Sequence, residues 1–234
     1  MDLAALGRVL VIAPHADDEV LACGGLLARL ADQGTAVRVQ FMTVDGFHHY
    51  GTDGGTTYDE RLDEIDQVAK LLDFDWDIAY GDRDLIEQLD TVPKRDLVDL
   101  FEKRMNEFRP ELVLIPSGAD YDQDHVATFE TAVAALRPIA PVFGKWLVPH
   151  VLVYESPKIL WWVDAIPRPE VFLDVTEVID RKLAALAAYR SQARPSPHIR
   201  SPESVTALSC LRGKEIGVEH AEAFKVLRSI LSAS

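Results

Sequence analysis

The chain has 234 residues, and 48% of them are hydrophobic, which fits one compact domain over residues 1–234 and is too high for a disordered chain. Its formal net charge of −14 repels phosphate backbones, so nucleic acid is not an expected partner. The two cysteines provide no disulfide framework, and the N-terminus lacks the pattern of a signal peptide. No apolar run reaches the ~18 residues that cross a bilayer, so we expect a cytoplasmic protein without membrane insertion.

Short apolar runs alternate with amphipathic stretches along the first part of the chain. The runs that we interpret as strands are residues 8–13, 36–43, 75–80 and 112–115. Apolar residues at helical spacing predict helices over residues 22–32, 58–72, 94–108 and 125–136. This alternation predicts βαβ units and a parallel sheet. If the strand order is the common 3-2-1-4-5, the first and fourth strands are neighbours at the point where the order reverses.

The pattern becomes mixed in the last hundred residues. Residues 151–154 and 171–175 are predicted strands, and residues 194–202 form a proline-rich loop. The predicted helices in this part are residues 176–191, 203–212 and 219–232. The whole pattern predicts an α/β fold with a doubly wound, mostly parallel, Rossmann-like sheet and helices on both faces.

The segment P-H-A-D-D-E at residues 14–19 lies where the first strand ends and a helix begins. Ligands bind at this edge of open α/β sheets, and imidazole and carboxylate are good ligands for zinc. His15 and Asp18 are three residues apart and can reach one ion, which leaves Asp17 free to act as a base. The alternative is that the two aspartates only cap the helix.

A second polar segment, D-Y-D-Q-D-H at residues 120–125, follows the fourth predicted strand. If the first and fourth strands are neighbours, His125 can complete a set of two histidines and one aspartate with a fourth position open to water, as in catalytic zinc sites. Taken alone, His125 is more often a structural histidine.

These segments resemble the motifs of the PIG-L/LmbE-like zinc-dependent N-deacetylases. The first motif of that family reads A-H-P-D-D-E, and the second often reads D-x-H-Q-D-H. Further similar segments are residues 20–25, 61–64, 182–192, 212–213 and 221–224.

The resemblance implies a metal held by His15, Asp18 and His125, with zinc, or iron(II) in vivo, as the ion. It implies catalytic roles for Asp17 as general base and for Asp124 as the acid that orients a histidine. Zinc lowers the pKa of water and polarises a carbonyl, which suits hydrolysis of an N-acyl amide, with acetyl as the favoured acyl group. The implied partner is a small N-acylated amino sugar or sugar conjugate, and the resemblance is compatible with a homo-oligomer.

One position departs from the family pattern. Asp122 stands where many members have a histidine thought to assist the oxyanion, and a carboxylate cannot do this unless it is protonated. We expect Asp122 near the metal and the substrate, but not as a ligand. Either the metal stabilises the oxyanion alone, or another side chain takes the place of the family histidine. The candidates for this replacement are His48, His49, His198 and Arg190.

Two further residues are candidate substrate contacts. The resemblance implies that Arg61, at the start of an amphipathic helix, faces the substrate, where it could bind a hydroxyl, carboxylate or phosphate; the alternative is a solvated helix arginine. Asp45 follows the second strand and could hold sugar hydroxyls. Trp161 and Trp162 could stack on a sugar or cover an oligomer surface.

Other functions use parts of the same pattern. Iron(II) oxygenases use two histidines and one carboxylate but usually on an all-β scaffold. A nucleotide-binding module would need a glycine-rich phosphate turn after the first strand, where this chain has acids. An amidase for a non-sugar natural product, or a weakly active or non-catalytic homologue, remains the alternative.

Overall fold

The computed structural model describes residues 2–44, 55–81, 85–139, 141–158 and 168–230. The strands are β1 (Arg8–Ala13), β2 (Ala36–Phe41), β3 (Asp75–Ile78), β4 (Leu112–Ile115), β5 (His150–Tyr154), β6 (Val171–Asp174) and β7 (Ala221–Ser229). The α-helices are α1 (Asp18–Asp32), α2 (Tyr58–Leu72), α3 (Lys94–Phe108), α4 (Gln123–Ala135), α5 (Ile179–Ala188) and α6 (Pro202–Ile216).

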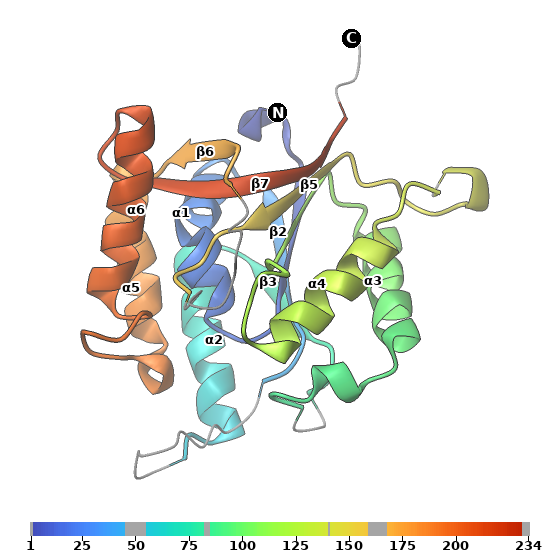
Figure 1. Ribbon diagram of the computed structural model, residues 1–234, viewed down its shortest axis with the longest axis horizontal. Coiled ribbons are helices and arrows are strands. Elements are labelled where there is room, and N and C mark those ends of the chain that lie inside the picture. Colours follow the sequence, from blue (N-terminus) through green and yellow to red (C-terminus); the bar gives the residue numbers. More distant parts are fainter. Residues whose placement is uncertain (1, 45–54, 82–84, 140, 159–167, 231–234) are drawn as a thin grey trace.

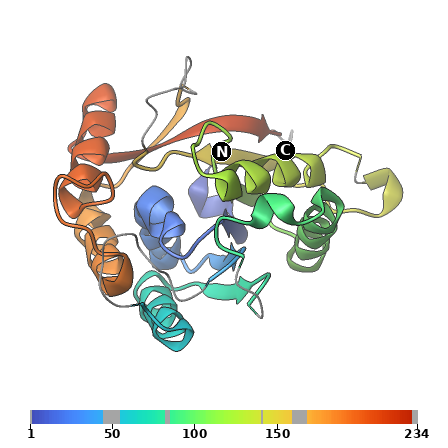
Figure 2. The ribbon, with the colours of Figure 1, turned by 60° about the horizontal axis from the view of Figure 1, so that its bottom comes forward.

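The strands form one sheet in the order β3-β2-β1-β4-β5-β7-β6, with the first five in parallel and β7 antiparallel to both of its neighbours. Helices α1, α2 and α5 pack together on one side of the sheet, and α3 and α4 on the other (Figures 1 and 2). The predicted fold class is therefore confirmed, including the pairing of the first strand with the fourth.

Strand β1 is central because both of its faces are apolar. Val9 and Val11 enter the core cluster that contains α1, whereas Leu10 and Ile12 enter the cluster formed with α3 and α4. A strand buried on both faces needs an almost continuous apolar run, which is what the sequence R-V-L-V-I-A supplies.

A buried ion pair fixes α1 against β7. The Glu222 carboxylate accepts the backbone N–H groups of Gly25 and Leu26 at 2.7 and 2.8 Å, and Lys182 on α5 donates to it at 2.7 Å. A Cβ at Gly25 would lie 2.5 Å from Val175 Cγ1, so only glycine permits this close approach. These contacts join three segments that are far apart in the sequence.

Several predicted elements differ from the structure. Residues 219–232 were expected to be helical, but this segment contains strand β7, which fills the position between β5 and β6. Its Ala, Glu, Lys and Leu residues favour a helix locally, and the pairing with two strands outweighs that preference.

Two helices have other bounds than expected. The expected helix over residues 176–191 is divided into α5 and two short 3-10 turns, and α1 starts at Asp18 instead of residue 22. In the described part of the chain, no helix is long and apolar enough to cross a membrane.

Candidate metal centre

Both polar segments lie at the carboxyl ends of paired strands. β1 and β4 run in parallel with Val9 beside Leu112, so the turn that follows β1 and the loop that follows β4 leave the sheet at the same edge. His15 and Asp18 come from the first of these segments, and His125 lies in the first turn of α4. Two segments more than a hundred residues apart therefore meet at the switch point of the sheet.

The three predicted ligand residues face one another. His125 Nε2 lies 3.2 Å from Asp18 Oδ2, and His15 Nδ1 lies 3.7 Å from the same oxygen. One ligand atom from each residue lies within 4.8 Å of the others, and the imidazole rings are 5.5 Å apart at their centroids. Two imidazoles and one carboxylate at this spacing fit a first-row divalent cation with a further coordination position.

Acidic residues hold both imidazoles in place. Asp124 is fully buried, lies 3.0 Å from His15 Nε2, and accepts the backbone N–H groups of Glu87 and Leu89 at 2.7 and 2.8 Å. It therefore orients His15, on the other segment, and not its neighbour His125. Because Asp124 contacts Nε2 of His15, the other ring nitrogen, Nδ1, faces Asp18.

His125 has its own acidic neighbour, which the sequence analysis did not single out. Asp120 Oδ2 lies 2.9 Å from His125 Nδ1, at ion-pair distance but outside hydrogen-bond geometry. Lys158 donates to the same Asp120 oxygen at 2.5 Å. Lys158 carried no recognisable signal, because it follows β5 in an irregular segment far from both motifs.

The electrostatic field at this centre favours positive charge. Burial lowers the pKa of His125, but Asp18 and Asp120 outweigh this effect and raise the pKa to about 10. Burial likewise raises the pKa of Asp18, but His125, His15 and Arg200 together outweigh this effect, and the pKa falls below its ordinary value. Carboxylates that hold a proton on a buried imidazole also favour a cation in the same place, so the site's charge agrees with its donor set.

Asp17 has the most unusual backbone of the site. Its φ of 140° is outside the regions that non-glycine residues normally adopt, and strain of this kind persists where the surrounding structure enforces it. The Glu19 carboxylate accepts the Asp17 N–H at 3.1 Å and is itself held by the Tyr189 hydroxyl at 2.6 Å. Burial raises the pKa of Asp17, and the charge of Arg200 opposes that shift.

Arg200 is the cation that reaches Asp17, with Nη1 3.3 Å from Oδ2. Of the replacements considered for the family histidine, His198 accepts the Arg200 backbone N–H at Nδ1, and Arg190 points to Gln67. His48 and His49 lie outside the described residues, as do Asp45, Trp161 and Trp162. The proline-rich loop was noted in the sequence, but nothing in its pattern distinguished Arg200 from its neighbours.

Asp122 caps helix α4. Its side chain accepts the Asp124 N–H at 2.9 Å, a usual role for aspartate at a helix N-cap. One oxygen also groups with His15 and Asp124 within 4.8 Å. Asp122 thus lies beside the centre, and its predicted substrate role stays a prediction.

Arg61 is buried among protein partners. Its Nη2 donates to the Ala16 carbonyl at 2.6 Å, and its Nη1 donates to Glu64 at 3.0 Å and Ser191 at 2.8 Å. The guanidinium therefore supports the turn between His15 and Asp17. Its role in substrate binding stays a prediction.

We expect Arg61→Ala to lower the free energy of unfolding by about 3–5 kcal/mol, because the Glu64 carboxylate would remain buried without its cationic partner and, among the residues that the structure describes, only Ser191 would still donate to it. Denaturant unfolding measures this change. Arg190→Ala, on an exposed arginine nearby, is the control and should change stability by less than about 0.5 kcal/mol. A variant of Arg61 with normal stability and impaired substrate binding would show that the contact with substrate dominates.

Comparison with known proteins identifies the family. The model of the PIG-L family, described as GlcNAc-PI de-N-acetylase, matches residues 10–136, which contain both polar segments. The chain belongs to this family. It is 31% identical over 189 residues to the uncharacterized deacetylase YaiS of Escherichia coli K12, covering 78% of this chain and 90% of that protein.

Other relatives of this PIG-L family chain are named for a deacetylase and for a hydratase. It is 27% identical to a probable N-acetyl-alpha-D-glucosaminyl L-malate deacetylase 2 of Bacillus cereus, over 79% of this chain and 83% of the relative. It is 28% identical to a 4-oxalmesaconate hydratase of Pseudomonas putida, over 78% and 73% of the two chains. The crystal structure of the conserved protein TT1542 from Thermus thermophilus superposes with a TM-score of 0.74 at 28% identity, covering 97% of each chain.

Proposed function

We propose that this protein is a metal-dependent hydrolase that cleaves the N-acyl amide of an amino sugar or sugar conjugate, with N-acetyl as the first acyl group to test. The observation that carries the proposal is the convergence of His15, Asp18 and His125 within 4.8 Å at the carboxyl edge of the sheet. The deacetylase relatives support the reaction class, and the relative named for an N-acetylglucosaminyl malate supports a sugar substrate.

The chain's own residues supply the remaining chemistry. His15, Asp18 and His125 would hold zinc, or iron(II) in vivo; such a cation supplies Lewis acidity toward a carbonyl and makes water a stronger nucleophile. Asp17, buried beside Asp18, accepts the proton of the attacking water and returns it to the leaving amine. Asp124 and Asp120 keep the two imidazoles in orientation.

The direct test is release of acetate from N-acetylated sugars by protein loaded with one equivalent of zinc. The panel includes N-acetylglucosamine, its glycosides and a non-sugar acetamide of similar size. Preferred cleavage of the sugars supports the proposal. No amide cleavage by fully loaded protein would contradict it, and hydration of an unsaturated carboxylic acid in its place would favour the activity named for the hydratase relative.

Arg200 positions Asp17 in this proposal. Because one ion pair of 3.3 Å fixes the carboxylate, Arg200→Ala should lower kcat between about 10- and 100-fold with unchanged metal content. Arg200→Lys keeps the charge and should recover part of the loss. Arg190→Ala serves as control, and a change in KM alone, with normal kcat, would assign Arg200 to substrate binding.

A further inference from the structure

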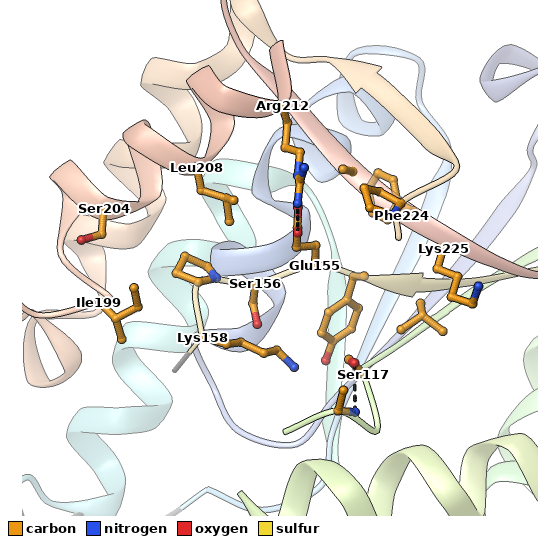
Figure 3. A pocket seen from close by; sticks show the side chains of 16 residues that line it. Ser117, Glu155, Ser156, Lys158, Ile199, Ser204, Leu208, Arg212, Phe224 and Lys225 are labelled. Atoms are coloured by element: carbon orange, nitrogen blue, oxygen red, sulfur yellow. Dashed lines mark hydrogen bonds and ion pairs between the residues drawn. The ribbon is translucent and has the colours of Figure 1, made fainter. Parts of the chain in front are cut away.

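A cavity of about 220 Å³ lies beside the candidate metal centre and is not used by the proposed chemistry. Its walls come from β5, β7, α6 and the segments next to them (Figure 3). Ile199 and Leu208 lie on one side of it and Phe224 lies on the other. The volume has room for roughly seven groups the size of a water molecule.

The cavity borders the cleft that contains the metal ligands. Ser156, Pro157, Lys158 and Ile199 line the cavity and also line the cleft formed with Asp18 and His125. Lys158 contacts Asp120, which in turn contacts His125. The cavity and the metal cleft therefore adjoin each other at Pro157 and Ile199.

The chemistry of the walls favours an uncharged, apolar occupant. Most of the charged side chains are paired: Arg212 donates to Glu155 (dashed in Figure 3), and Lys158 donates to Asp120. The remaining one, Lys225, lies at the rim with Nζ 3.9 Å from the Glu170 carboxylate. The other wall residues are mainly apolar: Val153, Tyr154, Pro157, Ile199, Leu208 and Phe224. Three serines, Ser117, Ser156 and Ser204, are the uncharged polar residues of the wall. A sugar ring has more hydroxyls than these can satisfy and would bury the rest against apolar side chains, whereas a hydrocarbon chain gains free energy from the same burial.

We propose that this cavity binds the hydrocarbon chain of an N-acyl group longer than acetyl. The inference rests on the proposed amide hydrolysis, and it assigns the acyl half of the substrate to the cavity and the amine half to the opposite side of the metal cleft. Acetyl fills little of the space, and a chain of about six carbons matches its volume.

The first test is a series of N-acylglucosamines from acetyl to decanoyl with the zinc-loaded protein. We expect kcat/KM to rise up to about fourfold for each added methylene as far as hexanoyl and then to level off or fall. Leu208→Trp, which places a large ring in the cavity, should lower kcat/KM for the hexanoyl substrate at least about tenfold more than for the acetyl substrate. Leu208→Ala should move the optimum to longer chains.

The matched control is Leu211→Trp, on an exposed leucine of the same helix, which should leave the chain-length profile unchanged. Far-ultraviolet circular dichroism and thermal unfolding verify that each variant is folded. Acetyl preference in the wild type, with the same profile in the Leu208 variants, would overturn the inference and leave amide hydrolysis intact.

A binding measurement separates the cavity from the reaction. Calorimetry with acetate and hexanoate as probes of the zinc-loaded protein should show hexanoate binding at least about tenfold more tightly, and Leu208→Trp should remove this difference. Equal affinity for the two acids would overturn the inference. If no amide is cleaved but hexanoate is still preferred, the proposed function fails while the apolar cavity is retained as a binding site.

Discussion

Asp17→Asn is expected to lower kcat by about 100-fold or more while the protein stays folded and keeps its metal. The amide has nearly the same shape as the carboxylate, and the surrounding structure that holds Asp17 at a φ of 140° is unchanged, so asparagine should adopt the same backbone. What the variant loses is the ability to accept a proton from water. The Asp17 side chain is not among the three that would hold the ion, so metal content should be unchanged.

Steady-state kinetics and zinc analysis on the same preparations measure the two effects. Asp63→Asn, on an exposed aspartate of α2, is the matched control and should retain wild-type turnover. An Asp17→Asn protein that turns over normally would remove Asp17 from the reaction. Loss of zinc together with activity would instead make Asp17 part of the metal site.

Removal of the metal should reduce activity by about 1000-fold or more, because the cation supplies several kcal/mol of transition-state stabilisation. A chelator followed by dialysis should produce this loss in the wild type, and one equivalent of zinc should restore activity. Zinc should also raise the unfolding temperature of the wild type, since a ligand that binds the folded state stabilises it.

Variants of the ligands should lose this response. His125→Ala and Asp18→Asn are expected to show no recovery with zinc and a much smaller shift in unfolding temperature. His150→Ala, at the start of β5 and outside the centre, should behave as the wild type. Full activity after exhaustive chelation, with less than about a tenth of an equivalent of any transition metal, would exclude the proposed chemistry.

The sequence predicts the centre better than its surroundings. His15, Asp18 and His125 follow buried strands, and the strand order alone brings the ends of those strands together. Arg200 and Lys158 lie in irregular segments, where no periodicity reveals a direction for the side chain. Their proximity to Asp17 and Asp120 depends on how the loops return over the sheet edge, which is a property of the tertiary structure.

The secondary structure of β7 likewise depends on tertiary structure that the sequence pattern does not reveal. Its residues have good intrinsic helix preference, and only the open sheet position between β5 and β6 makes the segment extended.

The sequence also leaves open which acid orients which histidine. Asp124 is adjacent to His125 in the chain, yet its side chain reaches His15. Both residues lie in the first turn of α4, where neighbouring side chains point in different directions.

The most direct test of the shared metal centre is a crystal structure of the zinc-loaded protein with anomalous scattering measured at the zinc edge. We predict one strong peak bonded to His15 Nδ1, Asp18 and His125 Nε2 at about 2.0–2.2 Å, with Asp122 outside the coordination sphere. A fully occupied ion elsewhere, or direct coordination by Asp122 in place of one of these three residues, would contradict the assignment.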